Sequence, residues 1–287
     1  MTMINLTVES ILTAQRGLAD LHDSIVGFIN KYGFDPLPNS IGGKELNDQP
    51  ILDDLKTAYS QGHFLFESAT DHSIALKKLL EGKVPTIAPW TCVRAGLEAA
   101  AYSCWLLNPK IDARQRISRS IAFRYEDLTQ QVKLACAMCD EKRVAYLKNR
   151  IAEQEKESEA LGYLAILDKN QKKIGVAERF PRATECIEKE LGEEILFRIM
   201  SAMAHAKSWA LLQLGYHAPK SESPTILRKN LSKPGAVVLL ETSAKMISKC
   251  VWVRSSLYGH DLEKLSDLLD KGFNKMGFEA DHAYWRV

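Results

Sequence analysis

Apolar residues recur at helical spacing along nearly the whole of this 287-residue chain. In the first such stretch, predicted as a helix over 5–32, one stripe contains Ile11, Leu18, Leu21 and Ile25. This spacing follows the 3.6-residue period of an amphipathic α-helix. The alternation typical of half-buried strands is missing, and no Asn-Gly or Asp-Gly pair marks a tight hairpin. The sequence therefore predicts an all-α fold, a bundle of long helices without a β-hairpin.

Turn residues divide the chain into further predicted helices. These are expected over 51–81, 88–107, 111–139, 140–167, 184–214, 235–257 and 260–276. The segment 140–167 carries the run EQEKESE, so we expect an exposed, charged helix or helical hairpin there. We predict a single all-helical domain over 1–287, with a core at about 51–215 and a helical C-terminal extension at 235–276.

Composition limits the class of protein only broadly. Lys and Arg total 38 against 36 for Asp and Glu, so the net charge of +2 neither favours nor excludes nucleic acid. Uncharged apolar windows fall short of the roughly 18 residues of a membrane span, and the N-terminus lacks the pattern of a signal peptide. We therefore expect a cytoplasmic protein that does not enter the membrane and keeps its thiols reduced.

The sequence predicts neither a metal nor a cofactor. A carboxylate di-metal bundle needs two Glu-x-x-His pairs on facing helices, and the chain does not contain two. Walker and dinucleotide-binding motifs are also missing. Cys136 and Cys139 form one Cys-x-x-Cys without a second pair at zinc-finger spacing. We expect these two cysteines to act as small apolar residues on one helix face.

Polar residues stand where two apolar helices predict burial. Asp71 and His72 lie in ATDHSIAL, and Arg94 and Glu98 lie one turn apart in RAGLEAAAYSCWLL, with Tyr102 one turn further on. As a buried ion pair, Arg94 and Glu98 would make Glu98→Ala cost about 3–5 kcal/mol. Groups of mixed sign on facing helices are typical of a functional pocket. Core ion pairs and hydrogen-bonded core histidines are the alternative interpretation.

A third polar set interrupts the apolar stretch EILFRIMSAMAHAKSWALLQL at 194–214. Arg198 and His205 are seven residues apart, which is two helical turns. With Ser201 between them, they are expected to form one polar strip on an otherwise apolar helix.

The spacing of Arg198 and His205, with six residues between them, resembles the signature of the HEPN superfamily, which is an arginine, then four to six intervening residues, then a histidine. The strings ATDHSIAL, RAGLEAAAYSCWLL and FRIMSAMAHAKSWALL, in this order, are also similar to a bacterial group of uncharacterised all-helical proteins. The second resemblance covers most of residues 60–215.

The HEPN resemblance implies a chemistry. Many members cleave RNA without a metal, as toxins or defence effectors, in a cleft formed by two protomers. By position, His205 would act as general acid or base and Arg198 would stabilise charge on the phosphate. The resemblance thus implies a homodimer acting on RNA.

A basic run at 110–124, KIDARQRISRSIAFR, is a candidate for phosphate binding. It offers four arginines for RNA: Arg114, Arg116, Arg119 and Arg124. The alternative interpretation is an ordinary solvated helix face.

Two functions stay open on the sequence. The first is the metal-independent ribonuclease. The second is a non-catalytic helical module that binds a small ligand or a partner protein through the polar set. The near-neutral charge favours the module, as does Ile199, because HEPN ribonucleases usually carry a polar residue directly after the arginine. The accessibility of Arg198 and His205 separates the two functions.

Overall fold

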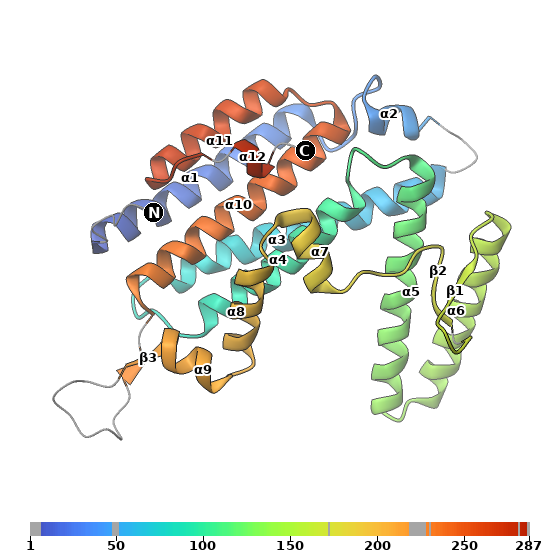
Figure 1. Cartoon of the computed structure of the whole chain (residues 1–287). Coiled ribbons are helices and arrows are strands. Elements are labelled where there is room, and N and C mark those ends of the chain that lie inside the picture. The colour runs from blue at the N-terminus through green and yellow to red at the C-terminus, as the bar shows by residue number, and fades with distance from the viewer. Residues whose placement is uncertain are drawn as a thin grey trace. The chain divides into compact units, whose positions relative to one another are not determined.

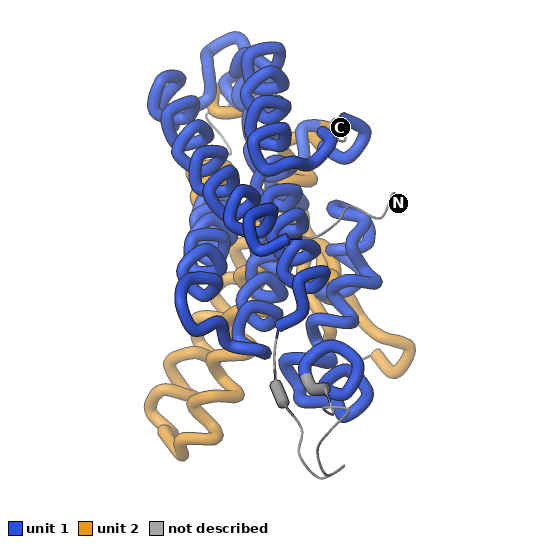
Figure 2. Tube along the Cα trace, turned by 90° about the vertical axis from the view of Figure 1, so that its left-hand side faces the viewer, with its two compact units in different colours: residues 1–44, 62–109, 183–287 blue, residues 45–61, 110–182 orange. Residues whose placement is uncertain are grey.

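The computed structural model describes residues 7–47, 52–171, 173–217, 228–229, 231–280 and 282–285. Residues 5, 6 and 51 of the predicted helices lie outside these ranges. The contacts divide the chain into two compact units (Figure 2): unit 1 comprises 1–44, 62–109 and 183–287, and unit 2 comprises 45–61 and 110–182. The predicted core at 51–215 supplies residues to both units. The all-α prediction is confirmed. No helix in the described part of the chain is long and apolar enough to cross a membrane.

Unit 1 is built around one buried helix, α10 (Lys233–Tyr258). It contacts α1 (Val8–Tyr32), α4 (Ala88–Leu106), α11 (Leu262–Met276) and α12 (His282–Trp285). Helices α1, α10 and α11 run side by side (Figure 1). This arrangement lets the apolar stripe of α1 and the apolar helix α10 bury each other.

The remaining elements assigned wholly or partly to unit 1 are shorter, apart from α3 (Leu52–Leu79), which belongs to this unit from Gly62 onward. They are α2 (Ile41–Glu45), α7 (Ala183–Leu191), α8 (Glu194–Ala204), α9 (Ser208–Ala210), the π-helical turn η2 (Leu211–Gly215), and the strands β3 (Tyr216–His217) and β4 (Arg228–Lys229). Strands β3 and β4 pair antiparallel.

A glycine explains part of the RAGLEAA string in α4. A Cβ placed on Gly96 would lie 2.6 Å from Cε of Met246 on α10 and 3.2 Å from Cβ of His72 on α3. A side chain at this position would force Met246 and His72 to shift, so glycine permits the close approach of α4 to both helices. The strings ATDH and RAGLEAA therefore meet through packing, which does not by itself require a functional site.

Unit 2 is a helical hairpin with a small sheet. Helix α5 (Ala113–Ala137) packs along α6 (Glu141–Ala160) and contacts β2 (Lys173–Val176), which pairs antiparallel with β1 (Ala165–Leu167). The two helices form the arms of the hairpin (Figure 1). Most side chains of α6 are exposed or half-buried, as the charged segment predicts.

The expectation that the chain holds no β-hairpin is wrong for β1 and β2. Their turn is made without an Asn-Gly or Asp-Gly pair. The Asp168 carboxylate accepts a hydrogen bond from the backbone N–H of Asn170 at 2.8 Å, and its carbonyl accepts from Gln171 N–H at 3.0 Å. Gln171 takes the left-handed conformation, with φ 60°. An aspartate side chain can organise a turn in this way.

The Cys-x-x-Cys pair also departs from its prediction. Helix α5 ends at Ala137, and Cys139 lies beyond it with φ 55°. Both Cys136 and Cys139 are exposed free thiols. They therefore do not pack as small apolar residues on a helix face, because the helix ends between them.

His260 lies buried just past the end of α10. Its side chain is 4% exposed, and its ring stacks on Tyr32 at a centroid distance of 5.0 Å and meets the Tyr258 ring edge-on at 5.8 Å. Ser255 Oγ lies 3.4 Å from its Nδ1. Burial, assisted by the positive charge of Arg254, lowers the pKa of His260 to about 4.

The stability of the chain is expected to fall as the pH drops from about 6.5 to about 4. An unfolded histidine takes up its proton near pH 6.5, whereas folded His260 stays neutral down to about pH 4. The unfolded state then binds more protons, so each pH unit in this window lowers the free energy of unfolding by up to about 1.4 kcal/mol.

Urea titrations should show that the free energy of unfolding depends less steeply on pH in His260→Phe than in the wild type. A control variant of an exposed histidine, His205→Ala, should keep the wild-type slope. Equal slopes for all three proteins would contradict this assignment.

Candidate functional site

The stretch predicted as one helix over 184–214 is divided, and that prediction is wrong. It contains α7, α8, α9 and the π-helical turn η2. The first break follows α7, where Gly192 takes a left-handed φ of 68°. Glycine adopts this conformation readily, which makes it a common helix terminator.

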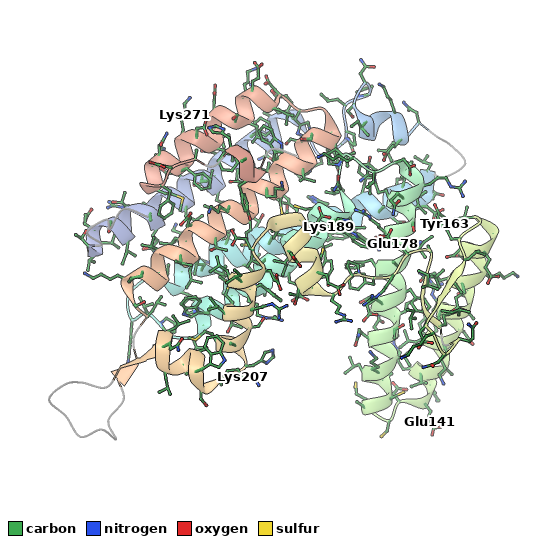
Figure 3. All side chains as sticks on the ribbon, viewed as in Figure 1. Glu141, Tyr163, Glu178, Lys189, Lys207 and Lys271 are labelled. Atoms are coloured by element: carbon green, nitrogen blue, oxygen red, sulfur yellow. The ribbon has the colours of Figure 1, made fainter. Side chains whose placement is uncertain are left out.

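The second break sets the position of His205. The backbone N–H of Lys207 donates to Ala202 O at 2.9 Å, and that of Ala206 donates to Met203 O at 3.1 Å. With Ala206 at φ 51°, this is a Schellman motif. His205 is the C-cap residue of α8, and its side chain is exposed. Figure 3 labels Lys207 in this turn at the end of α8.

Arg198 also faces solvent. Its side chain is 65% exposed, and its Nη2 and Nε lie 2.6 and 2.7 Å from the same carboxylate oxygen of Glu194, one turn earlier. Arg198 and His205 are therefore not buried polar residues within an apolar helix. They are accessible groups on α8 and at its C-terminal end.

The third member of the predicted strip, Ser201, meets a different predicted set. Arg94 Nε donates to Ser201 Oγ at 2.9 Å, and Arg94 Nη1 lies 3.5 Å from Glu98 Oε2. The Arg94 guanidinium also stands 4.9 Å from the centre of the Phe197 ring, within range of a cation–π contact. The structure thus brings Arg94, Glu98 and Ser201 together where α4 contacts α8.

Glu98→Ala is expected to cost less than about 1 kcal/mol, because the Arg94–Glu98 pair is not buried. The two side chains are 27% and 35% exposed, and Arg94 keeps Ser201 and Phe197 as partners. The expectation of a buried pair is corrected accordingly. Urea denaturation of the variant and the wild type measures the difference. A loss of 3 kcal/mol or more would show that the arginine depends on this carboxylate.

The other predicted pocket residues lie in separate surroundings. Tyr102 is buried in α4. His72 is half-buried, with Nδ1 3.9 Å from Cys92 Sγ, and the Cys92 thiol donates to the His72 carbonyl at 3.1 Å. Burial, and then the negative charge of Asp71, raise the pKa of the Cys92 thiol. Asp71 itself is exposed and lines a cavity beside α1, which the sequence did not predict.

Within unit 2, Arg116 of the basic run is held by a buried carboxylate. Its Nε and Nη2 donate to the two oxygens of Glu45 at 2.9 and 3.2 Å, and its side chain is 0% exposed. Tyr59 Oη donates to the same carboxylate at 2.8 Å. Arg116 is therefore part of the interior of unit 2, and its expected place on an exposed RNA-binding face is wrong.

The other three arginines of the run also have partners in unit 2. Arg119 is buried, with Nε 3.8 Å from Glu178, so its expected exposure is also wrong. Arg124 lies 3.6 Å from a carboxylate oxygen of Asp54, and Arg114 donates to a backbone carbonyl, Leu161 O, at 3.1 Å. Figure 3 labels Glu178 in this unit. The structure of unit 2 thus accounts for the basic run without a ligand.

Exposed apolar side chains accompany Arg198 and His205, and the sequence pattern did not predict their exposure. Ile195, one turn before Arg198, is 74% exposed, and Trp209 and Leu212, just after the Schellman turn, are 50% and 57% exposed. Exposed large apolar side chains, tryptophan above all, are common at protein–protein interfaces. The sequence contains no signal for this exposure, because the helical pattern predicts that the apolar residues of the whole stretch are buried in the core.

Metal coordination is not indicated in the described part of the chain. Its histidine, cysteine, aspartate and glutamate side chains form no group of three or more suited to a metal ion.

Comparisons with family models, with curated proteins and with solved structures each found no match to this chain. The resemblance to HEPN proteins therefore stays a prediction.

Proposed function

We propose that this chain is a metal-independent ribonuclease of the HEPN type, in which His205 transfers protons and Arg198 binds the scissile phosphate. The observation that carries the proposal is the exposure of both side chains on one short helix and its cap. A core histidine and a core arginine would have been sealed by their neighbours, and neither is.

The arrangement suits RNA cleavage by the neighbouring 2′-hydroxyl. His205 would accept the 2′-hydroxyl proton while the 2′-oxygen bonds to phosphorus and the bond to the 5′-oxygen breaks. The leaving 5′-oxygen takes a proton from a second, protonated imidazole. Arg198 would stabilise the negative charge that develops on the phosphate oxygens. Its exposed pair with Glu194 is easily released, since such pairs contribute only about 0–1 kcal/mol.

A second copy of the chain would supply the second imidazole. The exposed Ile195, Trp209 and Leu212 offer an apolar surface on the segment that carries Arg198 and His205. Pairing through this surface would bring two copies of the site together, the arrangement that the HEPN resemblance implies. Trp209→Asp is expected to weaken self-association, measured by sedimentation over a range of concentrations. Unchanged association in this variant would place any dimer interface elsewhere.

The test of the ribonuclease is cleavage of end-labelled single-stranded RNA in the presence of EDTA. We expect fragments that end in a 2′,3′-cyclic phosphate and begin with a 5′-hydroxyl, because no water attacks in the first step. Strict dependence on an added divalent metal, or fragments with 5′-phosphates, would contradict the proposal, as would the absence of any cleavage.

The second candidate function, a helical module that binds a small ligand, is favoured by one observation, which is the cavity that Asp71 lines in unit 1. Arg94, Glu98 and Ser201 contact one another and do not line this cavity. Ligand binding would therefore use this cavity and not the whole predicted polar set.

A further inference from the structure

A cavity of about 320 Å³ lies in unit 1, lined by residues of α1, α3 and α10. Its apolar wall includes four buried side chains, Ile25, Ile29, Phe66 and Ile247. This volume is at the lower end of the range for small-molecule sites, which are mostly apolar with a few polar groups. A smaller cavity of about 200 Å³ continues between α1 and α3, since both are lined by His22 and Ile74.

Two carboxylates line the cavity from α3. Glu67 and Asp71 are one turn apart and exposed. Among the described residues, no nitrogen of a lysine, arginine or histidine side chain lies within 4.0 Å of either carboxylate, the distance that defines an ion pair. Like charges at this spacing weaken a helix by a few tenths of a kcal/mol. The pair therefore does not stabilise the helix that carries it, and a bound cation would remove the repulsion.

The nearby positive charge of Arg254 does not neutralise this pair. Arg254 is buried, and its Nη2 donates to the carbonyls of Gly33 and Phe34 at 3.4 and 3.3 Å. Its guanidinium lies over the Tyr258 ring at 4.4 Å. The negative charge of Glu67 acts on Arg254 at long range. The hydrogen bonds to Gly33 and Phe34 nevertheless keep the Arg254 guanidinium at the end of α1.

A third polar group on the cavity wall has no partner. Thr70, between the two carboxylates in sequence, is 8% exposed, and its hydroxyl has no hydrogen bond within the described ranges. Threonine in a helix commonly donates to the carbonyl four residues earlier. A buried hydroxyl without a partner is costly, and a ligand with a hydrogen-bond donor would satisfy it.

We propose that this cavity binds a small organic cation with an apolar body, such as an alkylammonium ion. The ammonium group lies near Glu67 and Asp71 and donates to the Thr70 hydroxyl. The alkyl chain extends along Ile25, Ile29, Phe66 and Ile247. Charge and apolar surface are both needed, because exposed carboxylates alone bind weakly and the apolar wall alone does not select a charge.

The test uses octylammonium as the probe, with isothermal titration calorimetry on the full chain. Octanol, with the same chain and no charge, is expected to bind roughly fivefold or more weakly, as two exposed charge contacts imply. Methylammonium, which has the charge without the chain, is expected to show no saturable binding. Equal affinity for octylammonium and octanol would overturn the proposal, and so would no binding of octylammonium.

Matched variants place the site. Glu67→Gln and Asp71→Asn should each weaken octylammonium binding by roughly two- to fivefold. The control Asp53→Asn changes a carboxylate on the same helix whose side chain is 99% exposed, and it should leave binding unchanged. Wild-type affinity in both cavity variants would show that the probe binds elsewhere.

A third variant tests the hydroxyl without disturbing the shape of the cavity. Thr70→Val should bind octylammonium more weakly, while its stability to urea stays the same or rises. Unchanged affinity in Thr70→Val would remove the hydroxyl from the site. All of these variants should keep the RNA cleavage proposed for Arg198 and His205, so failure of one proposal leaves the other standing.

Discussion

Glu45→Ala is expected to lower the free energy of unfolding by about 3–5 kcal/mol, because it leaves the Arg116 guanidinium buried without a counter-charge. The carboxylate accepts two hydrogen bonds from Arg116 and one from Tyr59, and its side chain is 9% exposed. The substitution removes both hydrogen bonds from Arg116 to the carboxylate, and the long bond to the carbonyl of Ile111 at 3.3 Å does not supply a counter-charge. A buried guanidinium cannot recover the lost interactions from water.

Two matched variants separate charge from packing in this prediction. Glu45→Gln keeps the size of the side chain and an acceptor for Arg116, so its loss should be smaller than that of Glu45→Ala. Glu9→Ala breaks an ion pair with Arg16 whose side chains are 70% and 74% exposed, and it should change stability by less than about 1 kcal/mol. Urea denaturation measures all three. A loss in Glu45→Ala no larger than that in Glu9→Ala would contradict the role of the buried pair.

His205→Ala is expected to slow RNA cleavage by about 10²- to 10⁴-fold, the range for loss of a general acid or base. His205 caps α8 through its backbone, whose N–H donates to Ser201 O at 3.0 Å, and its side chain is exposed. Alanine keeps that backbone bond, so the fold should persist while proton transfer is lost. Arg198→Lys, which keeps a charge but loses the planar guanidinium, should also slow cleavage. His282→Ala, at a half-buried histidine on α12, serves as the control.

Most helices could be predicted because burial on one face imposes its period on the sequence. The ends of α10 and α11 are marked by Gly259 and Gly277, both with left-handed φ. The break after α7 carried the same signal in Gly192. The apolar residues around Gly192 continue the helical pattern, and this pattern predicts a helix that runs through the break.

The end of α8 had no such signal. The left-handed position of its Schellman motif is filled by Ala206, a residue with high helix propensity. Local propensity therefore predicted continuation, and the position of His205 at a helix end depends on the three-dimensional structure. This single turn changes the interpretation of His205 from a buried to an exposed residue.

Pairings between distant residues were also beyond the reach of sequence patterns. Arg116 looked like part of a basic face because its partner Glu45 lies 71 residues earlier. The cavity beside Glu67 and Asp71 depends on the placement of α1 and α3, which a single sequence does not specify. The pair Arg94 and Glu98 was predictable, because one helical turn joins them.

The most direct test of the proposed function compares the wild type, His205→Ala and His282→Ala on the same labelled RNA in EDTA. The proposal predicts cyclic-phosphate fragments from the wild type and His282→Ala at similar rates, and a rate at least about 100-fold lower from His205→Ala. Equal cleavage by all three proteins, or no cleavage by the wild type, would contradict it.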